Sequence, residues 1–151
     1  MAALRSISIK LTFTALLFMA CYSHGQAQIV FSTESYDSLA KEAQDSQKLV
    51  FIDFRADWCR PCKLMESTTF KDSTLADFVN KNFISYKADT DFKKNHKLKR
   101  KYRINALPTL VVIDPNNPDE VLLRVIGYTP AHILLDDLKG MRNSEGDKIF
   151  H

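Results

Sequence analysis

Apolar residues form short runs and helix-spaced repeats from residue 29 to about residue 140, with polar or Gly- and Pro-containing breaks between them. The run from Leu49 to Phe54 is apolar without alternation, as is typical of a central strand covered on both faces, and Asp53 interrupts it. Shorter apolar runs predict four more strands, at residues 29–31, 83–88, 110–113 and 121–126. The last two flank a turn rich in Pro and Asn, so we expect them to pair as an antiparallel hairpin.

Helical spacing of apolar residues predicts the connections between these strands. Tyr36, Leu39 and Ala43 repeat in this way after a Ser- and Thr-rich stretch that can supply an N-cap. Further helices are expected after Cys59, around residues 75–79, over residues 92–102 and from Pro130. The element order β-α-β-α-β-α-β-β-α predicts an α/β fold, a mixed central sheet with helices on both faces. A chain of 151 residues is long enough for one such domain.

The first 27 residues have the pattern of an export signal. Arg5 and Lys10 form a positive start, and residues 11–20 form an apolar segment that is too short to span a bilayer. Small residues at 25 and 27 suit cleavage before Gln28. We therefore expect a signal peptide at residues 1–27, a domain at 28–142 and a polar, frayed C-terminal tail at 143–151.

Two alternatives stay open for this segment: an uncleaved anchor, or a lipid anchor at Cys21, where residues 18–20 match a lipoprotein motif weakly. In each case the domain would work outside the cytoplasm, as a periplasmic or secreted protein or as a membrane-tethered lipoprotein. Residues 28–151 carry a formal charge of +1, which gives no reason to expect nucleic acid as a partner.

The chemistry of the chain is concentrated in Trp58-Cys59-Arg60-Pro61-Cys62-Lys63. If Cys59 and Cys62 lie in the first turn of a helix, they share nearly one face and can form a small-ring disulfide. The free N–H groups at a helix start favour a thiolate, and thiol pKa values fall from about 8.5 to between ~3.5 and 7.5 in such places. The charge of Arg60 acts in the same direction, and Pro61 is well tolerated where no N–H is needed.

Inert buried cysteines or half of a metal site are the alternatives for this pair. A zinc site needs four ligands, and beyond the pair the mature chain offers only His96, His132 and His151, without a second clustered motif. A single close pair in an exported chain is also a poor structural staple. We therefore expect redox chemistry, with no metal and no cofactor other than the Cys59–Cys62 disulfide.

The chain resembles the thioredoxin superfamily. The resemblance rests on residues 53–63, then Lys87, then Leu107-Pro108-Thr109-Leu110, then Gly127, in an order and spacing that cover most of residues 29–142. It departs from thioredoxin in the Arg-Pro dipeptide between the cysteines and in the absence of a proline at residues 66–69. It is closer to secreted thioredoxin-like proteins and to the C-terminal domain of the bacterial transmembrane disulfide reductase.

The resemblance implies roles for the catalytic residues. Cys59 would be the attacking thiol and Cys62 the resolving thiol, with Asp53 as the buried carboxylate behind Cys62 and Lys87 near it. Asp53 could instead be exposed or form a structural ion pair. Its place in an apolar strand favours burial, and a buried carboxylate with a raised pKa would suit a proton acceptor.

The resemblance also implies a substrate-binding surface. Pro108 would follow a cis peptide bond and face the disulfide, which would leave the Leu107 backbone as a short edge for an incoming peptide. Trp58 would serve both as a packing residue and as an apolar wall beside the sulfurs. Arg60 and Pro61 complete the expected surface.

Seven cations lie between Lys93 and Arg103. They form either a solvated helix face or a docking patch for an acidic partner or a membrane surface. Together these features predict a monomeric, exported thiol–disulfide oxidoreductase that reduces disulfides of other exported proteins and receives electrons from a membrane or periplasmic donor. The alternative is a binding module, a chaperone or copper-handling protein that uses the thiols as ligands.

Overall fold

The computed structural model of the chain describes residues 28–32, 34–141 and 149–150. Five strands form one sheet in the order β1-β3-β2-β4-β5. β1 and β2 run parallel to β3, whereas β4 is antiparallel to both β2 and β5. The strands are β1 (Phe31–Ser32), β2 (Leu49–Arg55), β3 (Phe83–Asp89), β4 (Thr109–Asp114) and β5 (Asn117–Ile126).

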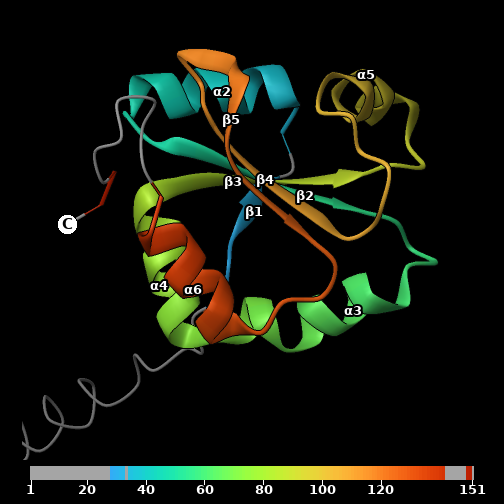
Figure 1. Cartoon of the computed structure of the whole chain (residues 1–151). Coiled ribbons are helices and arrows are strands. Elements are labelled where there is room, and N and C mark those ends of the chain that lie inside the picture. Colours follow the sequence, from blue (N-terminus) through green and yellow to red (C-terminus); the bar gives the residue numbers. More distant parts are fainter. Residues whose placement is uncertain (1–27, 33, 142–148, 151) are drawn as a thin grey trace, which may run out of the picture.

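Helices cover both faces of this sheet, which confirms the predicted α/β class. Figure 1 shows α2 and α5 on one side of the sheet, and α3, α4 and α6 on the other. The helices are α2 (Tyr36–Asp45), α3 (Arg60–Ser67), α4 (Ser73–Asn82), α5 (Lys93–Lys101) and α6 (Ala131–Lys139), with a short 3-10 turn, η1 (Thr69–Lys71), between α3 and α4.

The central strand β2 divides the core into two layers. Val50, Ile52 and Phe54 pack with Leu39 of α2 and with residues of α5. Phe51 points the other way, into the layer that contains α3, α4 and α6. Because strand side chains alternate, Asp53 and Arg55 share the face of Phe51 and lie on the side of the sheet covered by α3. The sequence thus places two charged residues toward the helix that carries the cysteines.

Two details differ from the sequence-based expectation. β5 begins at Asn117, within the predicted turn, because the ladder continues from Asp114 to Asn117 with register shifts at Ile113. The predicted C-terminal tail is not wholly polar and frayed, since Phe150 packs edge-on against Phe78 with ring centroids 5.2 Å apart. Apolar side chains at the end of a polar stretch can still return to the core when the core leaves apolar surface uncovered.

The predicted signal segment, residues 1–27, and with it Cys21, lies outside the described residues, as do residues 142–148 and 151 of the chain's end. Within the part of the chain that the structure describes, no helix has the length and apolar character needed to cross a membrane.

Candidate active site

Cys59 and Cys62 form a disulfide at the start of α3, with their Cα atoms 5.3 Å apart. Cys59 is the N-cap residue, and its Sγ accepts a hydrogen bond from the Cys62 backbone N–H at 3.3 Å. Pro61 occupies the first turn, where its missing N–H leaves no bond unmade. The Cys62 N–H has no partner within the helix and points at the Cys59 sulfur, so it would stabilise a Cys59 thiolate after reduction.

Both cysteines are more enclosed than a surface disulfide would be. Cys59 is 3% exposed and Cys62 is 2% exposed, and they pack with Ala56 and Leu107. The loop that contains Leu107 lies against them and covers them, although Arg60 and Pro61 beside them are exposed.

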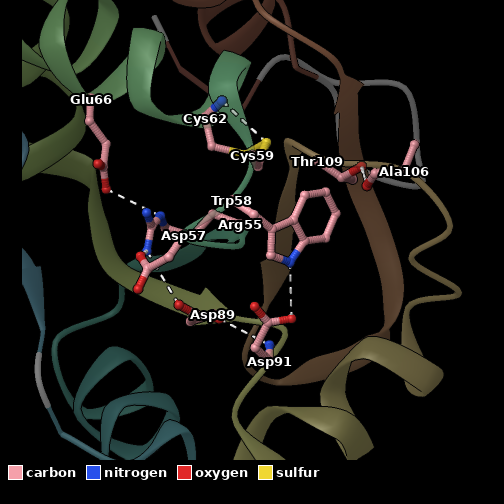
Figure 2. Close-up of a disulfide and its surroundings, with 10 residues drawn as sticks. All are labelled: Arg55, Asp57, Trp58, Cys59, Cys62, Glu66, Asp89, Asp91, Ala106 and Thr109. Atoms are coloured by element: carbon pink, nitrogen blue, oxygen red, sulfur yellow. Dashed lines mark hydrogen bonds and ion pairs between the residues drawn. A yellow bond between two sulfur atoms is a disulfide. The ribbon is translucent and has the colours of Figure 1, made fainter.

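The Leu107–Pro108 peptide bond is cis, as the resemblance implies. Two hydrogen bonds hold the segment around it. Thr109 Oγ1 donates to the Ala106 carbonyl at 2.8 Å (Figure 2), and the Gly127 N–H donates to the Pro108 carbonyl at 2.8 Å. Pro108 is buried and Leu107 is half-buried, so the segment lies directly against the disulfide.

Asp53 is 2% exposed in the middle of β2. Burial raises its pKa from 3.8 to about 7; the positive charges of Lys87 and Arg55 oppose this rise, and Glu66 adds to it. A carboxyl with such a pKa is present in both protonation states near neutral pH and can accept a proton there. It lies on the face of the sheet that α3 covers, which is the position the resemblance implies.

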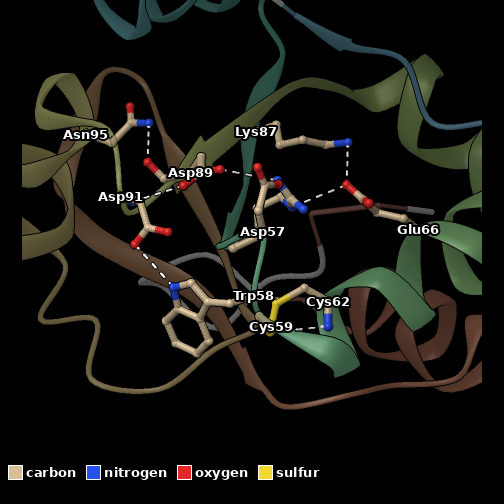
Figure 3. A network of polar contacts seen from close by, with 10 residues as sticks. Asp57, Trp58, Cys59, Cys62, Glu66, Lys87, Asp89, Asp91 and Asn95 are labelled. Carbon is tan, nitrogen blue, oxygen red and sulfur yellow. Dashed lines mark hydrogen bonds and ion pairs between the residues drawn. A yellow bond between two sulfur atoms is a disulfide. The ribbon is translucent and has the colours of Figure 1, made fainter.

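Lys87 sits beside Asp53 in the β2–β3 ladder. Its ammonium group bonds to Glu66 of α3, with Nζ 2.8 Å from Oε1 (Figure 3), and lies 4.8 Å from the centroid of the Phe31 ring. The predicted proximity to Asp53 is therefore present, but the ion pair of Lys87 is with Glu66.

Arg55 is the centre of a charged network that the sequence did not predict. Its Nη1 lies 2.8 Å from Asp57 Oδ1 and 3.3 Å from Asp89 Oδ2, and its Nε lies 3.3 Å from Glu66 Oε1. Burial lowers the pKa of Arg55, but the three carboxylates outweigh this effect and raise it. Glu66 accepts a hydrogen bond from Lys87 and forms an ion pair with Arg55, so the helix that carries the cysteines is tied to β2 and β3.

Trp58 is 72% exposed, so the packing role predicted for it is wrong. Its Nε1 donates to Asp91 Oδ1 at 3.4 Å, and Figure 3 shows the ring beside the disulfide. The indole therefore offers an apolar face next to Cys59 and links this site to the loop before α5.

Sequence reasoning did not anticipate Arg55 and its partners. The signal was present in Arg55, a second charged residue in an otherwise apolar strand. A metal site is not suggested by the described residues, which contain no group of three or more His, Cys, Asp or Glu side chains placed to hold an ion.

Comparison with known proteins agrees with this geometry. Residues 36–141 match the family described as Thioredoxin-like domain. The thiol:disulfide interchange protein DsbD of Campylobacter jejuni (strain RM1221) is 29% identical over 105 residues, which are 70% of this chain but only 18% of that protein.

Solved structures show the same relationship. A candidate disulphide-isomerase from Bacteroides thetaiotaomicron is 36% identical, with a TM-score of 0.66, over 77% of this chain and 95% of that one. The C-terminal domain of Neisseria meningitidis DsbD in the oxidised form shares the fold, with a TM-score of 0.60 at 19% identity, over 76% of this chain and 99% of that one. The chain belongs to the thioredoxin-like domain family.

Proposed function

We propose that this protein is a thiol–disulfide oxidoreductase that works outside the cytoplasm and reduces disulfides of other exported proteins through Cys59 and Cys62. The observation that carries the proposal is the placement of a reversible disulfide at the start of α3, against the cis Leu107–Pro108 segment and on the side of the sheet that holds Asp53. The export pattern of residues 1–27 supports the location.

In the reduced protein, the Cys59 thiolate attacks one sulfur of a partner disulfide. A Cys59–partner disulfide forms, and the other partner sulfur leaves as a thiolate that takes a proton from solvent. Cys62 then attacks Cys59 Sγ, the mixed disulfide breaks, and the second partner thiolate is released. The partner gains two electrons, and the protein is left with the Cys59–Cys62 disulfide seen in the structure.

Asp53 takes the proton that Cys62 loses before its attack. The thiol is buried, and a neutral thiol is a poor nucleophile, so the second step needs a nearby acceptor. With a pKa of about 7, the Asp53 carboxyl can take up that proton near neutral pH and release it to solvent when the partner leaves. The charge of Lys87 lowers the pKa of the Asp53 carboxyl, and the charge of Glu66 raises it.

The partner binds across the cis-proline segment and the exposed residues beside the cysteines. Trp58, Arg60 and Pro61 are exposed around Cys59, and the half-buried Leu107 offers backbone groups next to Pro108. An extended peptide that pairs with this short edge would bring its own disulfide to Cys59.

An insulin reduction assay with dithiothreitol as electron source tests the proposed chemistry. Wild type should accelerate precipitation of the insulin B chain, and Cys59→Ser should abolish the acceleration because no mixed disulfide can form. Cys62→Ala that is reduced beforehand and mixed with insulin without dithiothreitol should accumulate a trapped mixed disulfide. Full activity in Cys59→Ser would contradict the proposal.

Export is tested separately by fractionation of the native host. Antibody against residues 28–141 should detect the protein outside the cytoplasm. A cytoplasmic location, with intact residues 1–27 on the purified protein, would contradict the proposed location but not the chemistry.

A further inference from the structure

Positive charge in the described domain is concentrated in one helix, α5, and the remainder carries more acidic than basic residues. Residues 93–103 carry seven Lys and Arg and no carboxylate, whereas the rest of residues 28–141 has ten Lys and Arg and sixteen Asp and Glu. Among the residues whose placement is described, Lys101 alone of these seven forms an ion pair, with Asp119 at 3.0 Å. The basic helix is therefore a concentrated, largely unneutralised positive surface on a domain that is otherwise acidic.

Local charge interactions within this helix destabilise it. Lys93 and Lys97, and Lys97 and Lys101, are like charges four residues apart, which destabilises a helix. Its first turn has no acidic residue, and Phe92 gives no side-chain cap. Positive charge at a helix start opposes the macrodipole. Local electrostatics therefore does not account for this cluster of positive charge, which points to a role on the surface.

Buried contacts hold the helix in place in spite of this repulsion. Leu98 is 7% exposed in the core layer beside α2. The Asn95 side chain donates to the Asp89 carbonyl at 2.7 Å (Figure 3). It also accepts from the Tyr86 hydroxyl at 2.7 Å. The lysines are thus presented on a fixed scaffold.

The basic surface is hollowed where α5 meets the start of α2. Lys94, Lys97 and Lys101 line one side of a cavity of about 330 Å³, and Asp37 is the one carboxylate in its lining. A concave site lined by three lysines suits protruding carboxylates of a protein. A flat lipid surface would reach the lysine tips but would not fill the hollow.

This surface is continuous with the redox site. Phe92, which is 59% exposed, joins α5 to Asp91, and Asp91 accepts the hydrogen bond from Trp58 beside Cys59. A partner that lies along α5 would therefore extend to the disulfide. Asp57 and Asp91 near the indole would repel an acidic chain there, so the carboxylates of the partner should lie along α5.

We propose that α5 is the docking surface for an acidic segment of the protein whose disulfide this site reduces. The inference rests on the proposed function and names the chemistry of its partner. Electrostatic attraction between opposite charges raises association rates by about 10- to 1000-fold and is screened by salt.

Two synthetic peptides with the same internal disulfide test this docking, one flanked by Glu and one by Ser. The reduced wild type should react with the Glu peptide at least ~10-fold faster at low salt, and the rates should converge near 1 M salt, where the Debye length is about 3 Å. The triple variant Lys94→Gln/Lys97→Gln/Lys101→Gln should lose this preference while it keeps its rate with the Ser peptide.

The matched control is Lys71→Gln/Lys81→Gln/Lys139→Gln, which removes the same charge from exposed lysines around α4 and α6 on the other side of the sheet. It should keep most of the preference. Equal rates for the two peptides with wild type, or an equal loss of preference in both triple variants, would overturn the proposal. Binding to phosphatidylglycerol vesicles without any peptide preference would also overturn it, in favour of a membrane surface.

Binding without turnover separates docking from chemistry. A Glu-flanked peptide without cysteine, added to the oxidised protein, should shift the NMR signals of α5 and Phe92 amides, and the α5 variant should not respond. If neither disulfide peptide is reduced, the proposed function fails, and this titration alone supports or overturns the docking surface.

Discussion

Asp53 and Arg55 are buried ionisable residues two positions apart on the same face of β2, yet their surroundings favour the charged form of Arg55 and the neutral form of Asp53. Arg55 is 8% exposed and is surrounded by three carboxylates, so it stays charged. Asp53 is 2% exposed, and the opposing charges near it do not offset its desolvation, so its pKa rises to about 7. Burial turns an ionisable group into a proton carrier only where its counter-charges are too weak or are engaged elsewhere.

The difference between the two sites arises from the pairing of Lys87. Its ammonium is held 2.8 Å from Glu66, and Glu66 also lies 3.3 Å from Arg55 Nε. Part of the positive charge that could stabilise an Asp53 carboxylate is therefore neutralised by the helix that carries the cysteines. One carboxylate, Glu66, thus helps to keep Arg55 charged and Asp53 able to hold a proton.

Removal of the guanidinium should have the largest effect on stability. Arg55→Met leaves the nearly buried Asp89 carboxylate without its counter-charge, and breaking a buried ion pair costs about 3–5 kcal/mol. Urea unfolding of the oxidised protein at neutral pH measures this loss of stability. Arg100→Met, at an exposed arginine of α5, is the matched control and should change stability by less than about 0.5 kcal/mol. Similar values for the two variants would mean that the network contributes nothing beyond a surface charge.

Replacement of Asp53 should act in the opposite direction. Because its folded-state pKa lies above the ordinary value, the folded protein binds this proton more tightly than the unfolded chain does. The resulting stability is fully present below about pH 4 and is lost as pH rises through about 7. Asp53→Asn removes this loss and should stabilise the protein by up to about 4 kcal/mol at alkaline pH.

Urea unfolding at acidic and alkaline pH checks this pH dependence. The gain from Asp53→Asn should grow with pH, whereas Asp77→Asn, at an exposed position of α4, should show no such trend. A gain that is the same at both pH values would show that Asp53 is ionised in the folded protein throughout.

The two neighbours of Asp53 should move its pKa in opposite directions, by less than its burial does. Lys87→Met removes a charge that lowers this pKa and should raise it. Glu66→Gln removes a charge that raises it and also frees the Lys87 ammonium, so it should lower it. NMR titration of the Asp53 carboxyl carbon reads both shifts. Movement in the same direction in both variants would contradict the division of charge described above.

Much of the fold followed from patterns that are local in the sequence. The apolar run of β2, the start of α3 at Arg60 and the turn before β5 each depend on a few adjacent residues. The start of β5 at Asn117 was missed because the turn residues Asn117 and Pro118 continue an edge ladder, where a proline is tolerated. Phe150 was missed because nothing near it in the sequence reveals the rings of Phe78 and Phe83.

The candidate site was predictable where a known spacing marks it and not elsewhere. The disulfide between Cys59 and Cys62 followed from their spacing at a helix start, and the cis peptide bond before Pro108 from the resemblance; the structure contains both. The carboxylates around Arg55 come from three separate elements and have no common spacing, so only the folded chain brings them together. The exposure of Trp58 and its hydrogen bond to Asp91 are likewise not evident from the sequence.

The most direct test of Asp53 as the proton acceptor is the rate at which Cys62 resolves a mixed disulfide. At saturating concentrations of an aromatic disulfide with a coloured thiolate product, release of the second thiolate is first-order and reports this step. Wild type should show a rise in rate centred near pH 7, and Asp53→Asn should lose that rise and be slower by ~100-fold at neutral pH. Equal rates for the two proteins from about pH 6 to about pH 9 would show that Asp53 takes no part in the reaction.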